Sequence, residues 1–217
     1  MLRYALTAAA LGLIPATALS AQAVTNGGFE NPVVAPPCCN TVPPDSLPGW
    51  TVSTGNTNVV LGTYGSTNGN LAYEGNQYLD LVGQGGIGSI YQDLTTSVGQ
   101  VYTITFAYSH NLFTPSSATS ASASVGVGTL FDIITHNTGD TSNLDWRVYT
   151  NTFTATAPTT RLTFTNLTGG VNEGVFLDAI SVAAVPEPST WMMMLLGLAG
   201  IGFMTYRRNS KPALMAS

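Results

Sequence analysis

Two adjacent cysteines, Cys38 and Cys39, carry the most reactive side chains of this chain and are its only cysteines. Cysteines of exported proteins usually pair as disulfides. Neighbours can pair only through a small strained ring, so links to another chain and free thiols stay open as alternatives. A metal site is not expected, because no histidine accompanies the two thiols. We expect an oxidised state at these positions without choosing its form.

The segment Gly83–Gly88 fits the G-x-G-x-x-G pattern of dinucleotide-binding loops. That pattern binds a pyrophosphate only where a helix begins directly after it. The residues that follow, Ser89 to Thr95, are typical of a strand. We therefore reject nucleotide binding and expect a turn between two strands.

Catalytic motifs are missing from the sequence. It has neither a G-x-S-x-G elbow nor an H-E-x-x-H helix, and its two histidines are His110 and His136. The acids Asp132, Asp140 and Asp145 could form a glycosidase pair only if they met in space. Solvated loop positions are the simpler interpretation of these acids, so we expect no enzyme and keep a glycan hydrolase as the least favoured function.

Aromatic side chains offer a different chemistry, since an exposed ring can stack on a sugar while Asn, Gln or Asp binds its hydroxyls. Tyr64 and Tyr73 flank the Gly/Asn-rich stretch 65–70, which favours a loop, and we select them as ligand-binding candidates. Core positions are at least as good an interpretation for Trp50, Tyr108 and Trp146.

Charge narrows the range of partners. Charged residues make up 8% of the chain against 44% hydrophobic residues, a composition of exported β-rich proteins. Residues 24–189 contain two arginines and all eleven acidic residues, a net charge of −9. Without clustered Lys or Arg we exclude nucleic acid as a partner. Neutral glycans and divalent cations are compatible with this charge.

The N-terminus predicts export. Residues 1–23 combine Arg3, a short apolar run from Leu6 to Ile14, and the small-x-small ending Ala21-Gln22-Ala23. This is the arrangement of a cleaved signal peptide, with the cut after Ala23.

The C-terminus holds an apolar stretch between a proline motif and a basic cluster. Pro186-Glu187-Pro188 precedes residues 190–206, which would span about 26 Å as a helix, and Arg207 and Arg208 follow. We expect a transmembrane helix at 190–206 with its basic end in the cytoplasm. The prolines keep their segment extended and accessible.

These three elements resemble the PEP-CTERM sorting signal, here residues 186–210. The resemblance implies recognition by an exosortase that cleaves near the motif. The membrane contact would then be transient, and the mature protein would reach the outer surface or the exopolysaccharide matrix.

Between these ends, residues 24–185 alternate apolar and polar side chains over short runs. Tyr102, Ile104 and Phe106 share one face of a predicted strand, and Thr103 and Thr105 share the other. Further strands are predicted at 77–82, 89–95, 146–156, 161–167 and 175–185. The second half of 114–128 should become a strand towards residue 131, and 32–48 should be an irregular lead-in. The fold class is all-β, a β-sandwich.

The opening Val24–Glu30, Pro48-Gly49-Trp50, Gly75–Leu81 and Gly174–Val182 are similar to galactose-binding-like jelly rolls of the choice-of-anchor type. This resemblance implies a jelly-roll sandwich associated with polysaccharide, without established catalysis. It also implies a structural Ca²⁺ held by Glu30 and Asp178, whose carboxylates suit calcium. The alternative is that Glu30 caps a turn and Asp178 accepts a backbone hydrogen bond.

Together these features predict a non-enzymatic surface or exopolysaccharide-matrix protein processed by an exosortase. The second hypothesis is a carbohydrate-binding module with one specific glycan.

Overall fold

The computed structural model describes residues 24–42, 46–66, 68–83, 86–113, 119–168, 173–186 and 188–209. The predicted signal peptide, residues 1–23, lies outside the described residues, as does Glu187 of the proline motif.

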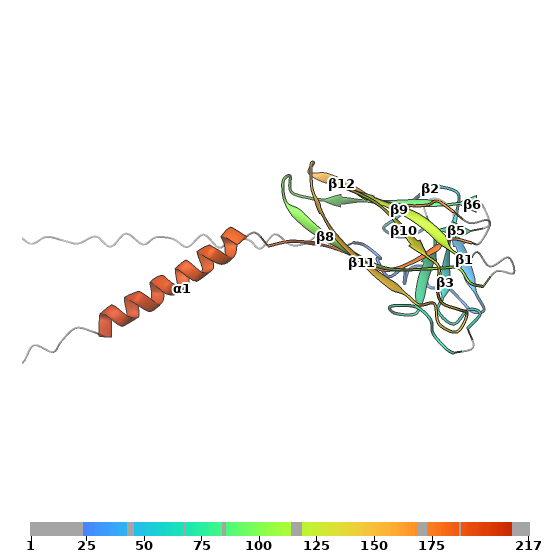
Figure 1. The fold of residues 1–217 in the computed structure, drawn as a ribbon, viewed down its shortest axis with the longest axis horizontal. Coiled ribbons are helices and arrows are strands. Elements are labelled where there is room, and N and C mark those ends of the chain that lie inside the picture. The colour runs from blue at the N-terminus through green and yellow to red at the C-terminus, as the bar shows by residue number, and fades with distance from the viewer. Residues whose placement is uncertain are drawn as a thin grey trace, which may run out of the picture.

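Two antiparallel sheets pack face to face (Figure 1), which confirms the predicted β-sandwich. The larger sheet runs in the order β1 (Cys39–Val42), β3 (Thr57–Leu61), β4 (Gln77–Asp80), β13 (Val175–Ala184), β8 (Val101–His110), β11 (Arg147–Thr154). The smaller sheet runs β10 (Leu130–His136), β9 (Ala121–Val127), β12 (Thr159–Asn166), β7 (Ser89–Thr95), β2 (Thr51–Thr54).

The strands β4 and β7 to β13 alternate between these sheets, except that β9 and β10 lie in the same one. Taken along the sequence, β4 and β7 to β13 form the orders β4-β13-β8-β11 and β7-β12-β9-β10. This is the strand order of a jelly roll, in which the last strand lies between the first and the third. The N-terminal segment joins the last strand as well, since the Ile180 N–H donates to the Gly27 carbonyl at 3.0 Å.

Alternation explains which faces are buried. Tyr102, Ile104 and Phe106 of β8 lie in the core between the sheets, while Thr103 and Thr105 are only half-buried. In β12 the core residues are Leu162 and Phe164. The strict period of two in the sequence therefore identified the inner face correctly.

Shorter strands escaped the sequence pattern. β1 forms inside the segment expected to be an irregular lead-in, where it pairs with β3. The strand expected in the second half of 114–128 is present as β9, which ends at Val127, whereas Phe131 belongs to the unpredicted β10. Pairing with a neighbour, which the sequence does not display, stabilises these strands.

Gly83 and Gly86 pair with each other in a hairpin of β5 (Val82–Gly83) and β6 (Gly86–Ile87). The G-x-G-x-x-G segment is thus a turn between strands, as expected.

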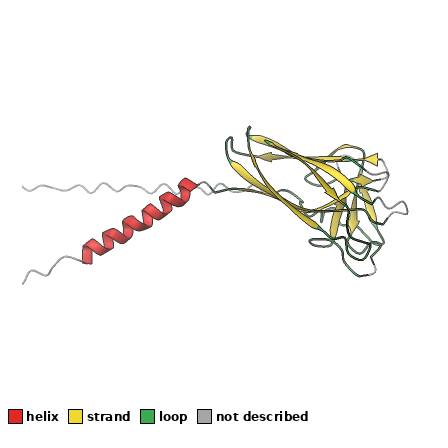
Figure 2. Ribbon diagram, viewed as in Figure 1, coloured by secondary structure: helices red, strands yellow, loops and turns green. Residues whose placement is uncertain are grey.

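The described part of the chain contains one helix, α1 (Pro188–Asn209), which follows the sandwich (Figure 2). Among the described residues, no helix has the length and hydropathy needed to cross a membrane, which corrects the expected transmembrane helix at 190–206. The physical reason is that polar residues occupy both ends of α1. Its apolar part, Met192–Met204, would span about 20 Å against about 30 Å for a hydrocarbon core.

Candidate functional site

The first candidate site surrounds Glu30, the predicted calcium ligand in the N-terminal segment of the sandwich. A turn with left-handed residues at Asn26 and Phe29 (φ 53° and 54°) positions this acid. The Asn26 side chain stabilises the turn by accepting from the Asn31 N–H and donating to the Asn31 carbonyl. One oxygen of Glu30, Oε1, then accepts from the N–H groups of Asn76 and Gln77 at 2.8 and 2.9 Å.

Asp178 approaches the same loop from the last strand. The register of β13 shifts directly after it, and Ala179 takes a positive φ of 50°. Its carboxylate accepts from the N–H groups of Glu74 at 3.0 Å and Ala179 at 2.7 Å. Burial, with a smaller contribution from the nearby Glu30, raises the pKa of Asp178 to about 7 against the opposing effect of the amide donors.

The structure thus brings the two predicted acids together around residues 73–77. Both carboxylates bind backbone amides, as in the alternative interpretation. Their mutual repulsion nevertheless marks a place where a cation would be favourable. Among the described residues, no group of three or more His, Cys, Asp or Glu forms a metal cluster. A calcium ion here would therefore need carbonyl or water oxygens as further ligands.

The predicted ligand tyrosines lie above the outer face of the larger sheet. Tyr64 packs edge-on against Phe113 at 5.8 Å, and Tyr73 packs against Trp146 at 6.2 Å. Tyr73 is 48% exposed, whereas Tyr64 is half-buried. Tyr64 belongs to a satellite cluster that covers this face, and Tyr73 lies at its edge through its contact with Trp146. Other members of the cluster are Val60, Tyr78, Phe113, Leu144, Trp146 and Phe176.

The two histidines are buried between the sheets. His110 Nδ1 lies 2.7 Å from His136 Nδ1, and His136 Nε2 lies 2.8 Å from the Asp145 carbonyl oxygen. Since one Nδ1 must donate and the other accept, the accepting ring is neutral. Burial also lowers the pKa of His136. These histidines therefore serve as core polar groups.

The structure also shows where the two cysteines and Trp50 lie. The structure joins Cys38 and Cys39 in a disulfide between neighbours. Trp50 is buried against Phe29 and Phe164, which supports its interpretation as core.

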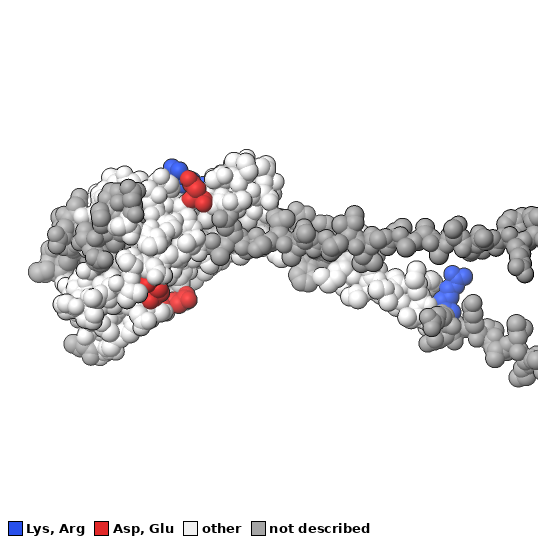
Figure 3. Space-filling model, turned by 180° about the vertical axis from the view of Figure 1, so that it is seen from behind, with Lys and Arg blue, Asp and Glu red and all other residues white. Residues whose placement is uncertain are grey.

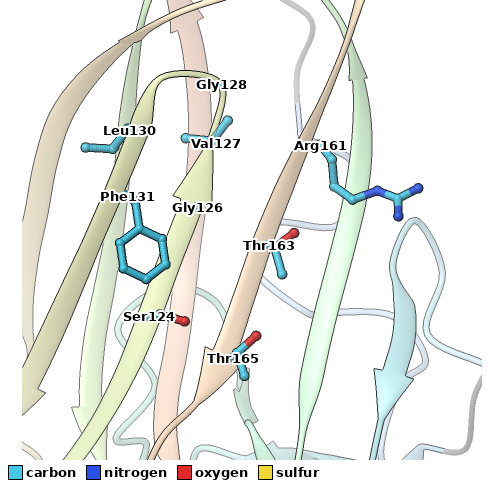
Figure 4. A pocket seen from close by; sticks show the side chains of 9 residues that line it. All are labelled: Ser124, Gly126, Val127, Gly128, Leu130, Phe131, Arg161, Thr163 and Thr165. Carbon is cyan, nitrogen blue, oxygen red and sulfur yellow. The ribbon is translucent and has the colours of Figure 1, made fainter.

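A second candidate site, which we call the sheet groove, lies on the exposed face of the smaller sheet (Figure 4). Its volume is about 440 Å³, and it is open to solvent over strands β9, β10 and β12. The lining residues are Ser124, Gly126, Val127, Gly128, Leu130, Phe131, Arg161, Thr163 and Thr165.

Strand register sets the chemistry of the sheet groove. Phe131 pairs with Gly126, Gly126 pairs with Thr163, and Thr163 pairs with Tyr91, so these four residues form one row across the sheet. Gly126 has no side chain, so the floor of the groove stays low beside Phe131. A Cβ at this position would already contact the Phe131 ring at 3.8 Å. Phe131 is 73% exposed and forms a wall on one side.

Arg161 forms the opposite wall. Its guanidinium lies 3.7 Å above the Tyr91 ring and binds Asp93 through two hydrogen bonds of 2.7 and 2.8 Å. The ion pair balances the charge of Arg161, so the sheet groove presents hydroxyls, an aromatic ring and a paired charge. This combination suits a neutral polyhydroxylated ligand.

Sequence reasoning missed this site. Alternation in β12 did place Arg161, Thr163 and Thr165 on the solvent face. It could not reveal that β9 and β10 lie beside them, because strands distant in sequence provide no such signal.

A family model described as "Protein of unknown function (DUF642)" matches residues 22–182. A second model, described as "PEP-CTERM protein-sorting motif", matches residues 184–208. No curated protein matches the chain in sequence.

Solved structures share the sandwich. One is a cyclase from Fischerella sp. TAU in complex with 4-(1H-indol-3-yl)butan-2-one, with TM-score 0.55, 20% identity, and coverage of 76% of this chain and 98% of that chain. Another is TmCBM61 in complex with β-1,4-galactotriose, with TM-score 0.50, 16% identity, and coverage of 76% and 100%. At this identity the likeness establishes the fold alone.

Proposed function

Because the chain belongs to the DUF642 family and ends in a PEP-CTERM sorting motif, we propose that it is an exported, non-enzymatic protein of the outer cell surface or exopolysaccharide matrix. In this role an exosortase processes the tail, and the sandwich binds a neutral glycan in the sheet groove. The same fold in TmCBM61, solved with β-1,4-galactotriose, is compatible with this proposal.

The observation that carries the glycan proposal is the form of the sheet groove. Phe131 offers an exposed ring beside a floor of Ser124, Thr163 and Thr165 hydroxyls. The nine residues that line it include no Asp or Glu, whereas a glycosidase needs two carboxylates at the scissile bond. Binding therefore fits this groove better than hydrolysis.

Replacing Phe131 by Ala tests this proposal. If its ring stacks on a sugar, we expect retention on the host's exopolysaccharide to fall about 30-fold, the loss of a ~2 kcal/mol anchor. The measurement is co-sedimentation of the purified domain with that polysaccharide.

Ile133→Ala is the matched control, since Ile133 is the next outward residue of β10, is 55% exposed and does not line the groove. Equal losses for both variants, or none for Phe131→Ala, would reject the site. A glycan array then separates a matrix protein, with no preferred sugar, from a carbohydrate-binding module with one.

We also propose a structural calcium ion between Glu30 and Asp178. Calcium at a hundredfold excess over its Kd should add about 2.7 kcal/mol to the free energy of unfolding, measured by denaturation with and without EDTA. Glu30→Gln should abolish the response. Glu74→Gln should keep it, because Glu74 contacts Asp178 through its backbone N–H. A wild-type domain indifferent to calcium would refute the site.

A further inference from the structure

The sorting tail begins directly where the sandwich ends. β13 ends at Ala184, and the Val185 N–H still donates to the Val101 carbonyl at 2.8 Å. The Gln100 amide donates to the Val185 carbonyl at 2.7 Å. Since α1 starts at Pro188, only two residues separate the sandwich from the helix.

Two residues of extended chain reach about 7 Å. An enzyme that binds the proline motif must therefore come almost into contact with the sandwich. The surface that it meets is formed by the turns 96–100, 128–129 and 155–158 together with Val185, which we call the tail-proximal end. These turns lie together, because Gly99 N–H donates to the Ala155 carbonyl and Thr154 N–H donates to the Thr129 hydroxyl.

None of the residues of the tail-proximal end is charged. Val98 is 66% exposed there, and Val185 is 36% exposed. The charges nearest these turns are Asp93 and Arg161, which form an ion pair, and Asp132 of β10, whose carboxylate accepts from the Tyr149 hydroxyl. On the face seen in Figure 3, the described part of the domain nearest the tail is white.

Other exposed acidic residues lie farther from the tail. Glu74, Asp140 and Asp145 are exposed on loops that connect the other ends of the strands. A domain with excess negative charge is repelled by any anionic surface, and the repulsion decreases with distance. An uncharged end next to the tail lets the sandwich approach the membrane while its acids point away.

We propose that the tail-proximal end is the surface on which the membrane-embedded exosortase docks when it binds the sorting motif. The short tether enforces the contact, and the uncharged turns allow it without burying an unpaired charge. The inference depends on the sorting motif alone and is independent of glycan binding.

The test is Val98→Asp, expressed in the host that carries the exosortase. Forcing a carboxylate into the contact should lower the fraction of tail-processed protein roughly tenfold. Ile87→Asp is the control, because Ile87 is also exposed (46%) but lies on β6, away from the tail (Figure 1). Thermal unfolding should show that both variants fold.

A second variant tests the tether. Inserting about twelve Gly/Ser residues between Val185 and Pro186 extends the reach to about 20 Å and should restore processing of Val98→Asp. Three results would overturn the proposal. The Val98→Asp variant could be processed as efficiently as wild type, both Asp variants could lose processing equally, or the insertion could fail to relieve the loss. Reduced membrane association of Val98→Asp in cells without exosortase would also overturn it, by assigning the surface to lipid.

Discussion

Replacing Gly27 by Ala should destabilise the sandwich by about 3 kcal/mol or more, because a Cβ at this position overpacks a backbone contact. The added atom would lie 2.0 Å from the Ile180 carbonyl oxygen. Backbone on both sides prevents an easy adjustment, and the Ile180 N–H bond to the Gly27 carbonyl fixes the spacing. Separating the N-terminal segment from β13 would also move Glu30 away from Asp178.

Gly28→Ala provides the matched control. A Cβ on Gly28 would meet only the Asp178 carboxylate, at the ordinary distance of 3.8 Å. We expect its free energy of unfolding to stay within about 1 kcal/mol of wild type. Urea denaturation measures both variants. Similar midpoints for Gly27→Ala and wild type would mean that the N-terminal segment does not pack on β13 in solution.

These two glycines illustrate what sequence can and cannot predict. The opening Val24–Glu30 was recognised as similar to a jelly-roll domain, and the calcium pair Glu30 and Asp178 that this resemblance implies brings it close to the last strand. The sequence does not distinguish Gly27 from Gly28, because the space available for a side chain at Gly27 depends on a backbone atom more than 150 residues away.

The same limit applied to the sites. Alternation identified the buried faces of β8 and β12, since burial on one side imposes a period of two. Tyr64 and Tyr73 lie in the expected loop, yet tertiary packing on Phe113 and Trp146 half-covers them. Phe131 gains its importance from Gly126 and Thr163, neighbours that only the strand register reveals.

Asp80 should give this domain an unusual pH dependence. The side chain lies at the end of β4, where it is 1% exposed. Its oxygens accept from the Val82 N–H and the Asn111 amide, both at 2.9 Å. Burial raises the pKa of Asp80 to about 7, against the lowering effect of these two donors.

The sign follows from linkage. The pKa in the folded state lies above the unfolded value of 3.8, so the folded protein binds the proton more tightly. The contribution of Asp80 to the free energy of unfolding is therefore complete below pH 3.8 and is lost as pH rises through about 7. A pKa difference of about three between the folded and unfolded states lowers the free energy of unfolding by about 4 kcal/mol at high pH. The pKa of Asp178 is also raised to about 7, so its ionisation lowers the free energy of unfolding in the same direction.

We therefore expect the free energy of unfolding of the wild-type domain to fall between about pH 4 and pH 7 and to level off above that, and the slope to be roughly halved in Asp80→Asn. The new amide faces the Asn111 amide, so this variant should lose about 1 kcal/mol at low pH. At high pH it should be the more stable protein, and the two curves should cross. Asp93→Asn should leave the slope in this window unchanged, because its exposed carboxylate has a pKa that the Arg161 hydrogen bond lowers. A wild-type stability that increases with pH here would mean that Asp80 stays ionised when folded.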